Sequence, residues 1–450
     1  MPQTNNDIFT DEEKEEAKRK KIADMEAATA NAVMKSIADK YEMKHEILRT
    51  NYATVLVLPL DDSKIEISFS NNLVMEWKEI LPNLLEYFSM KRPFSEIEDY
   101  LIKCHFAFAE CDEKKYAIYM NGIKKFEYNF FHTSFQESEK KNGPFGIFYQ
   151  PFYKFIKLLK LPIRVESIGD DAFDDCSSLE SIKIPDGVTE IGRGAFEGCK
   201  SLKMIELPYR VRSIERNVFL NCESLESIVI PSEVQSISTS AFEGCKSLKT
   251  IELPHRVRSI EEKVFLNCES LESIVIPSEV QSIHTSAFEG CQSLKSIKLP
   301  AKVTKIVSMT FRSCSSLKSI DIPIGVIYIG KYAFAECTSL SSIVLPAGIK
   351  SIGGYVFFDC LSLESIELSA NMKYIGKHAF DDCLSLESIK IPIEVESIGE
   401  SAFKDCSSLK TITYSGTMEQ WRKIKKGKQW NEEVPSKVVH CSDGDISINA

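Results

Sequence analysis

Cysteine is the residue type whose spacing in this sequence most suggests chemistry. A thiol can bind a metal, form a disulfide, attack an electrophile or fill an apolar core. The choice among these roles depends on where the spacing places successive side chains. Eleven of the fourteen cysteines follow one another at intervals of 23 residues, at Cys176, Cys199, Cys222, Cys245, Cys268, Cys291, Cys314, Cys337, Cys360, Cys383 and Cys406.

The sequence around each of these cysteines repeats with the same period, and a phenylalanine always stands three residues earlier. A period of 20 to 50 residues is typical of a solenoid or a propeller. The first half of the unit alternates apolar and polar residues, which predicts a strand. The second half predicts a short helical or 3₁₀ return after a glycine turn. One unit reads Leu179-x-x-Ile182-x-Ile184-Pro185, then Val188-x-x-Ile191-Gly192, then Ala195-Phe196-x-x-Cys199.

This unit resembles the BspA-like class of leucine-rich repeats, and the resemblance covers about residues 157 to 415. It implies an α/β solenoid, a right-handed leucine-rich-repeat coil with a parallel β-sheet on the concave face. Such repeats occur in bacterial and protist surface and adhesion proteins, where their usual role is to bind other proteins without catalysis. We therefore expect a non-enzymatic protein-binding scaffold whose partner is another protein.

Two features of the repeats depart from strict regularity. Residues 199–244 and 245–290 differ at only five positions, among them Asn217/Lys263, which indicates a recent duplication of two repeats. In the central coils the turn glycine is replaced, which leaves the turn geometry there open. The replacing residues are Glu215, Ser238, Glu261, His284 and Val307.

The strand spacing limits what the periodic cysteines can do. In a parallel sheet, equivalent thiols of successive coils would form a straight ladder with steps of about 4.8 Å. Zinc needs four ligands that converge on one point, which a straight line does not provide. Parallel side chains are also poorly aimed for disulfides, and an odd number leaves one thiol over. The sequence favours core filling, with a disulfide or a reactive thiol as the alternatives.

The outward positions of the predicted strands form the candidate binding face. Their hydroxyl groups leave room for a partner's side chains, although small residues could also simply fit a crowded inner curve. Aromatic and arginine side chains, which dominate many interfaces, are missing there, so an interface could be weak or lie elsewhere. The candidate residues are Ser181, Lys183, Met204, Glu206, Ser227, Thr250, Glu252, Ser273, Ser296, Lys298, Ser319, Asp321, Ser342, Ser365, Glu367, Ser388 and Lys390.

Other motifs do not indicate catalysis, a metal or a cofactor. The segment from Gly325 to Tyr332 nearly matches a phosphate-binding loop, but Tyr332 stands where the loop needs Ser or Thr. The seven histidines are scattered, and no zinc-protease, serine-hydrolase or kinase signature is present. We expect no enzymatic activity from the repeats.

The chain divides into four predicted regions: a charged amino-terminal helix at 1–50, a small α+β domain with an aromatic cap at 51–155, the solenoid at 156–415 and a carboxy-terminal cap at 416–450. The helix begins with a capping box at Thr10. Strands are predicted at 54–60 and 64–70, helices from Asn72 and Phe94, and a hairpin around Asn121-Gly122. The closing strand of the cap is predicted at 438–441.

Charge and hydropathy restrict the partner and the location. The net charge of −10 argues against nucleic acid, which would need a basic patch. The first residues lack a secretory apolar segment, and no apolar run reaches the roughly 18 residues of a membrane span. We expect a cytoplasmic protein. The aromatic stretch at 126–155 more readily caps the solenoid than contacts a membrane surface. The alternatives are a cell-surface adhesin exported by another route and an effector whose activity lies in residues 51–155.

Overall fold

The structure is a computed structural model that describes residues 35, 46–49, 53–60, 63–70, 106–111, 114–119, 125–126, 157–161, 163 and 165–448. The chain forms two compact units. The first comprises Met1–Glu166 with Ser178–Gly187, and the second comprises Ser167–Ser177 with Val188–Ala450.

The first unit contains a seven-stranded sheet in the order β1-β2-β3-β5-β4-β7-β9. The predicted strand pair is confirmed as β2 and β3, which form an antiparallel hairpin, each beginning one residue before its predicted start. The helix predicted at 1–50 is wrong at its carboxy-terminal end, where Glu46–Arg49 form strand β1, although Lys35 is helical. The predicted hairpin around Asn121-Gly122 is also wrong, because the flanking strands β5 and β6 belong to different sheets. The rest of the first helix and the starts of the helices predicted from Asn72 and Phe94 lie outside the described residues. The strands of this unit are β1 (Glu46–Arg49), β2 (Ala53–Leu60), β3 (Ser63–Ser70), β4 (Phe106–Cys111), β5 (Lys114–Tyr119), β6 (Lys125–Phe126), β7 (Leu158–Lys160) and β9 (Ser181–Lys183).

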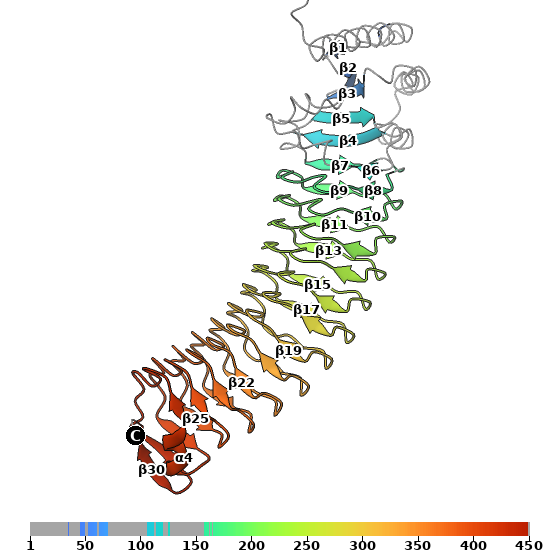
Figure 1. The fold of residues 1–450 in the computed structure, drawn as a ribbon. Helices are drawn as coiled ribbons and strands as arrows, with labels where there is room; N and C mark the ends of the chain where they lie inside the picture. The colour runs from blue at the N-terminus through green and yellow to red at the C-terminus, as the bar shows by residue number, and fades with distance from the viewer. Residues whose placement is uncertain are drawn as a thin grey trace, which may run out of the picture. The chain divides into compact units, whose positions relative to one another are not determined.

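The second unit is a solenoid whose 23-residue coils stack their strands in two parallel columns (Figure 1). The first column corresponds to the Leu-x-x-Ile-x-Ile segment of the unit. Strands that pair within the repeats are in register at an offset of 23 residues, as Ile205 is with Ile228, whereas β27 pairs with β29 at an offset of 27 residues. Between β17 and β21 the column continues as the single bridge Lys298–Asp321. Its strands are β11 (Met204–Glu206), β13 (Ser227–Val229), β15 (Thr250–Glu252), β17 (Ser273–Val275), β21 (Ser342–Val344), β23 (Ser365–Glu367), β25 (Ser388–Ile391), β27 (Thr411–Tyr414) and β29 (Val438–Cys441).

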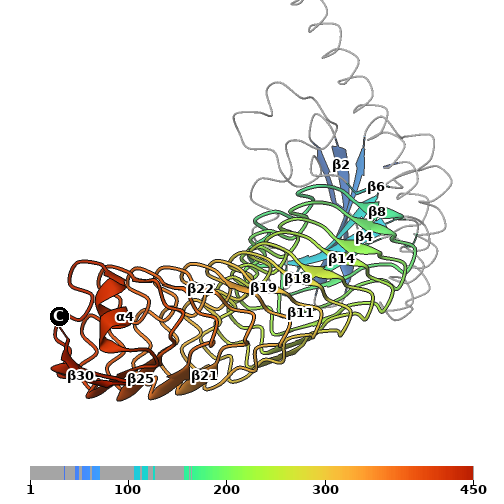
Figure 2. The same cartoon turned by 60° about the horizontal axis from the view of Figure 1, so that its bottom comes forward.

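The second column corresponds to the Val-x-x-Ile segment and has strands of two residues. Figure 2 shows that its β22 lies on a different side of the coil from β21 and β25 of the first column. Its strands are β8 (Ser167–Ile168), β10 (Glu190–Ile191), β12 (Ser213–Ile214), β14 (Ser236–Ile237), β16 (Ser259–Ile260), β18 (Ser282–Ile283), β19 (Lys305–Ile306), β20 (Tyr328–Ile329), β22 (Ser351–Ile352), β24 (Tyr374–Ile375), β26 (Ser397–Ile398) and β28 (Lys425–Lys426).

The Ala-Phe-x-x-Cys segment forms successive turns, so the predicted helical return is wrong. Two residues per coil, four positions apart, have positive φ, which a helix does not permit. These angles point backbone N–H groups toward the next coil: Phe196 N donates to Val218 O at 2.9 Å, and Gly198 N to Leu220 O at 2.8 Å. The first of the two positions, the left-handed column, is Asp171, Gly194, Asn217, Ser240, Lys263, Ser286, Met309, Tyr332, Tyr355, His378 and Ser401.

The hydrogen bond of the glycine turn is kept in the two central coils where Ser238 and His284 replace the glycine. Ser238 N donates to Ile214 O at 2.9 Å, as Gly192 N does to Ile168 O at 2.8 Å. The glycine is therefore not needed for the hydrogen bond. Gly192 instead allows the backbones of neighbouring coils to approach closely, because a Cβ there would lie 2.5 Å from the backbone nitrogen of Asp170.

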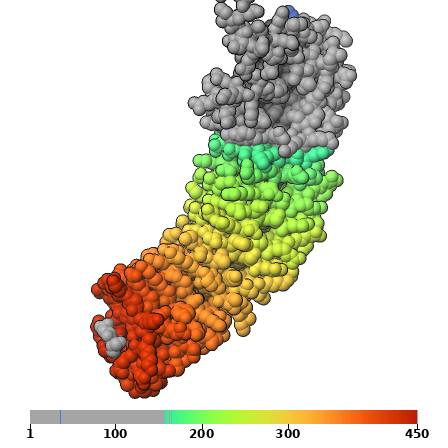
Figure 3. Space-filling view, viewed as in Figure 1, coloured from blue at the N-terminus to red at the C-terminus, as the bar shows by residue number. Residues whose placement is uncertain are grey.

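The core of the solenoid is built around a stack of phenylalanine rings. From Phe173 to Phe403, neighbouring ring centroids lie 5.1–5.7 Å apart and the planes are within 19° of parallel. All of these side chains are buried. Stacked aromatic pairs contribute roughly 0.5–1.5 kcal/mol beyond the burial of their area. Figure 3 shows successive coils of this unit in side-chain contact along the visible face.

The last coil is covered by residues 416–448. Helix α4 (Met418–Lys423) begins with a capping box between Thr417 and Gln420 and buries Trp421 completely. The predicted closing strand is confirmed as β29, which pairs with β27 and with β30 (Gly444–Ser447). Among the described residues, no helix combines the length and apolar character needed to span a membrane.

Candidate binding surfaces

The first strand column presents its outward residues to solvent. Within each three-residue strand the middle isoleucine is buried and its two neighbours point outward, because side chains alternate along a strand. Of the seventeen candidate residues, Ser181 is half-buried and the other sixteen are exposed.

This face also carries exposed apolar side chains. Val229, Val275 and Val344 are 56%, 72% and 61% exposed, and Met204 is 62% exposed. The register places each valine beside an acidic residue of the neighbouring coil, for example Val229 beside Glu206. We call the outward side of β11 to β27 the strand face. It combines a line of hydroxyl groups with a line in which valines and charged residues are mixed.

One ion pair lies just before the strand positions of the first column. Lys295 Nζ lies 2.6 Å from Glu272 Oε2, and both side chains are exposed. The hydrogen bond and charge of Lys295 lower the pKa of Glu272. An exposed pair of this kind contributes little to stability, so it adjusts the local charge without organising a reactive site.

The eleven periodic cysteines lie in the core as free thiols. From Cys199 to Cys406, each Sγ donates a hydrogen bond to the carbonyl oxygen of the phenylalanine 26 residues earlier, at 3.1–3.2 Å. Burial raises the pKa of these ten thiols, that of Cys337 to about 12. Because the thiolate is the reactive form, these cysteines are poor nucleophiles and metal ligands at neutral pH.

A second surface, the aromatic ladder, was not predicted from the sequence. Tyr332, Tyr355 and His378 occupy the left-handed column in three successive coils, with ring centroids 4.7 Å and 4.5 Å apart. The Lys331 ammonium lies 5.0 Å and 5.5 Å from the two tyrosine rings. Bulky residues are unusual at positive φ, so reading this column at its 23-residue interval could have revealed the ladder.

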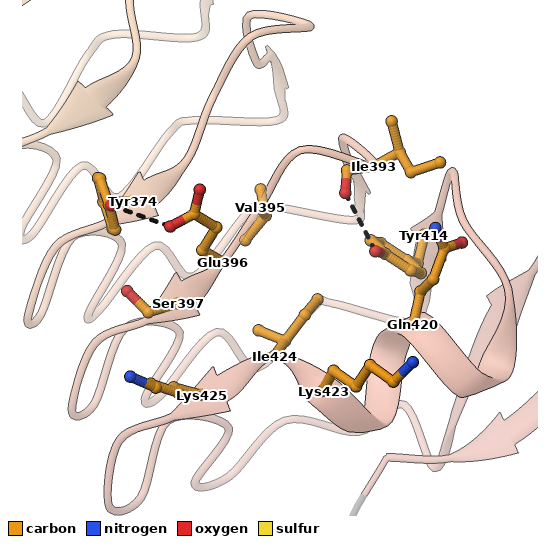
Figure 4. A pocket seen from close by; sticks show the side chains of 10 residues that line it. All are labelled: Tyr374, Ile393, Val395, Glu396, Ser397, Tyr414, Gln420, Lys423, Ile424 and Lys425. Atoms are coloured by element: carbon orange, nitrogen blue, oxygen red, sulfur yellow. Dashed lines mark hydrogen bonds between the residues drawn. The ribbon is translucent and has the colours of Figure 1, made fainter.

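A pocket of about 480 Å³ lies where the last coils meet the carboxy-terminal cap (Figure 4). Tyr374 donates a hydrogen bond to Glu396 at 2.9 Å, and Lys373 also binds this carboxylate, at 2.7 Å. Lys423 and Lys425 come from the cap side, and the half-exposed Ile393 supplies an apolar wall. The pocket has room for a small ligand or for side chains of a partner.

The chain matches the family model for the BspA type leucine rich repeat region, which spans six repeat copies, in overlapping segments at 146–271, 212–341, 258–383 and 304–425. A comparison with curated proteins found no match.

Similar solved structures include leucine-rich repeat proteins of bacteria. One from Bacteroides ovatus is 30% identical, with 62% of this chain and 88% of the other covered and a TM-score of 0.46. A leucine-rich cell surface protein from Faecalibacterium prausnitzii is 28% identical, with 71% and 96% covered and a TM-score of 0.39. A leucine-rich repeat protein of T. pallidum is 30% identical, with 41% and 78% covered and a TM-score of 0.31.

Proposed function

Because the chain belongs to the BspA-type leucine-rich repeat family, we propose that it is a non-enzymatic scaffold that binds another protein through the strand face. The observation that carries the proposal is the set of exposed valines on that face. Burying such a side chain in an interface is favourable by roughly 1.5–3 kcal/mol. A folded monomer gains nothing from leaving these side chains in water.

The size of the valine set suits a protein partner. Val229 and Val344 are five coils apart, which corresponds to about 24 Å at the spacing of neighbouring strands. A standard interface buries about 800 Å² on each partner, a patch of similar width. Acidic neighbours such as Glu206, Glu252 and Glu367 favour a partner that places apolar side chains beside lysine or arginine.

The absence of catalysis is part of the same proposal. The periodic thiols are the most regular reactive groups of the chain, and burial with a raised pKa removes them as nucleophiles. We place the scaffold in the cytoplasm, where free thiols persist, and keep the cell surface as the alternative. Fractionation of the native cells, with protease treatment of the intact surface, separates the two locations.

The strand face is tested by photo-crosslinking followed by affinity measurement. A photoreactive residue at Ser227, Ser273 or Ser342 identifies the partner in native extract. The affinity of the purified partner is then compared for wild type, for a triple variant of the strand face and for a matched variant of the second column in the same or adjacent coils. The triple variant is Val229→Arg, Val275→Arg, Val344→Arg, and the control is Ser236→Arg, Ser282→Arg, Ser351→Arg.

We expect the strand-face variant to bind at least about tenfold more weakly, because a guanidinium replaces buried apolar contact. The control variant should stay within about threefold of wild type. Equal losses in both variants would show that the strand face is not the interface. Equal affinity of the strand-face variant and wild type would likewise move the binding function away from the strand face.

A further inference from the structure

Three aspartates converge on the turn side of the last repeats. Asp381 and Asp382 are consecutive, and Asp405 occupies the position of Asp382 in the next coil. One carboxylate oxygen from each lies within 4.8 Å of the others. Positive φ angles of 61° and 56° at Asp382 and Asp405 bring the two side chains into line. The coil spacing therefore holds the three groups together despite their repulsion.

Asp381 supplies an independent sign that a ligand belongs there. The residue is only 4% exposed, and its Oδ2 lies 2.5 Å from Nδ1 of His378. Its other oxygen, Oδ1, is buried and has no hydrogen-bond partner. Leaving a buried carboxylate oxygen without a partner costs at least about 1–3 kcal/mol. A bound cation would satisfy this oxygen.

The neighbouring positive charge does not balance the cluster. Lys404 Nζ contacts Asp405 Oδ2 at 2.8 Å, and within the described part of the chain the other basic group paired with these aspartates is His378. The cluster therefore carries excess negative charge that a cation would relieve.

We infer that Asp381, Asp382 and Asp405 form a calcium site that ties two successive coils together. Carboxylate oxygens are ligands for hard divalent cations. Calcium binds oxygen at 2.3–2.6 Å, so it can bridge oxygens as much as about 5 Å apart, whereas magnesium at 2.0–2.1 Å reaches only about 4 Å. Water molecules would complete the six to eight ligands that calcium takes.

The test uses the full chain after removal of metal by chelation. The thermal unfolding midpoint is followed against CaCl₂ or MgCl₂ at constant ionic strength, and equilibrium dialysis with radioactive calcium gives the stoichiometry. The variants are Asp381→Asn and Asp405→Asn. The matched control is Asp359→Asn, which changes the same position of the preceding coil. Asparagine tolerates positive φ, so the changes at Asp359 and Asp405 remove charge while keeping the turn.

We expect saturable binding of one calcium ion with a Kd on the order of 0.1–1 mM, and weaker binding of magnesium. Asp381→Asn and Asp405→Asn should weaken calcium binding at least about tenfold, whereas Asp359→Asn should stay within about twofold of wild type. Asp405 is one-third exposed, so its variant carries the test if Asp381→Asn fails to fold. Equal losses in the Asp359 and Asp405 variants, equal affinity for magnesium, or no saturable binding would overturn the proposal.

Discussion

Cys291 Sγ donates a hydrogen bond of 3.2 Å to the carbonyl oxygen of Phe265 in the preceding coil. The same contact recurs at the neighbouring cysteines, so each thiol joins two coils from inside the core. A cysteine at this position fills a small apolar space and also satisfies a buried carbonyl group. The regular spacing of the cysteines is thus explained by packing.

The thiol ladder predicts that stability falls at alkaline pH. The ordinary thiol pKa is 9.0, and the pKa of folded Cys337 is about 12. Below pH 9 the thiol is protonated in both the folded and the unfolded protein, so its contribution to the free energy of unfolding is fully present. Between pH 9 and 12 only the unfolded thiol ionises, so stability is lost as pH rises. We expect the urea midpoint to fall between pH 9 and 10.5. The variant Cys337→Ala should release one proton fewer on unfolding at pH 10.5, and equal proton release would contradict this account.

The phenylalanine stack predicts a large loss of stability when one ring is removed. Phe288 is fully buried and stacks on Phe265 and Phe311 at 5.4 Å and 5.6 Å. Phe288→Ala should lower the free energy of unfolding by about 3–5 kcal/mol, because it leaves a cavity and breaks two stacking contacts. Urea unfolding measures the change. The control is Ser296→Ala, at an exposed position of the strand face. It should change the free energy of unfolding by less than about 0.5 kcal/mol.

The left-handed column predicts a stabilising substitution at Lys263. Its φ is 58°, and the duplicated position Asn217 has a φ of 60°. Asparagine adopts this conformation more readily than lysine, so Lys263→Asn should raise the free energy of unfolding by about 0.5–1 kcal/mol. Glu262→Asn, at the preceding residue, is the control and should give no gain. A loss of stability at Lys263→Asn in urea unfolding would mean that the lysine side chain makes a stronger contact than its pair with Glu262 at 4.0 Å.

We expect the stability of the carboxy-terminal cap to depend on the indole ring of Trp421. Trp421 is completely buried and packs against Tyr414 and Trp430 at centroid distances of 5.4 Å and 5.9 Å. Trp421→Ala should lower the free energy of unfolding by about 3–5 kcal/mol and expose the core of the last coil to solvent. Circular dichroism during urea unfolding follows this loss. The neighbouring Arg422 is exposed, and Arg422→Ala should leave the midpoint unchanged. An unchanged midpoint for Trp421→Ala would show that the cap does not stabilise the last coil.

The 23-residue period predicts most of the solenoid because it follows from burial. Residues such as Ile205 and Ile228 point into the core at a constant interval, so the strands can be placed from the sequence. The turns could not be predicted in the same way. Asn217, Lys263 and Tyr355 all adopt positive φ at one repeat position, so residue type there does not reveal the backbone angle. The local preference of lysine or tyrosine is overruled by hydrogen bonds to the next coil.

The candidate sites differ in how well they can be predicted from the sequence. The strand face follows from alternation, because the residues beside a buried isoleucine must point outward. The aspartate cluster can be recognised only in the three-dimensional structure. Asp382 and Asp405 share a repeat position, but the burial of Asp381 and the lack of a partner for its Oδ1 become visible only when the coils are stacked.

The hydrogen bonds between coils run along the solenoid axis, and this direction has a mechanical meaning. Bonds such as Phe196 N to Val218 O and Cys222 Sγ to Phe196 O would be loaded one coil at a time if the second unit were stretched from its ends. Each released coil would lengthen the chain by its 23 residues, about 8 nm when extended. The same ladder that gives the solenoid its regularity would therefore let it yield in equal steps and act as an extensible tether under load.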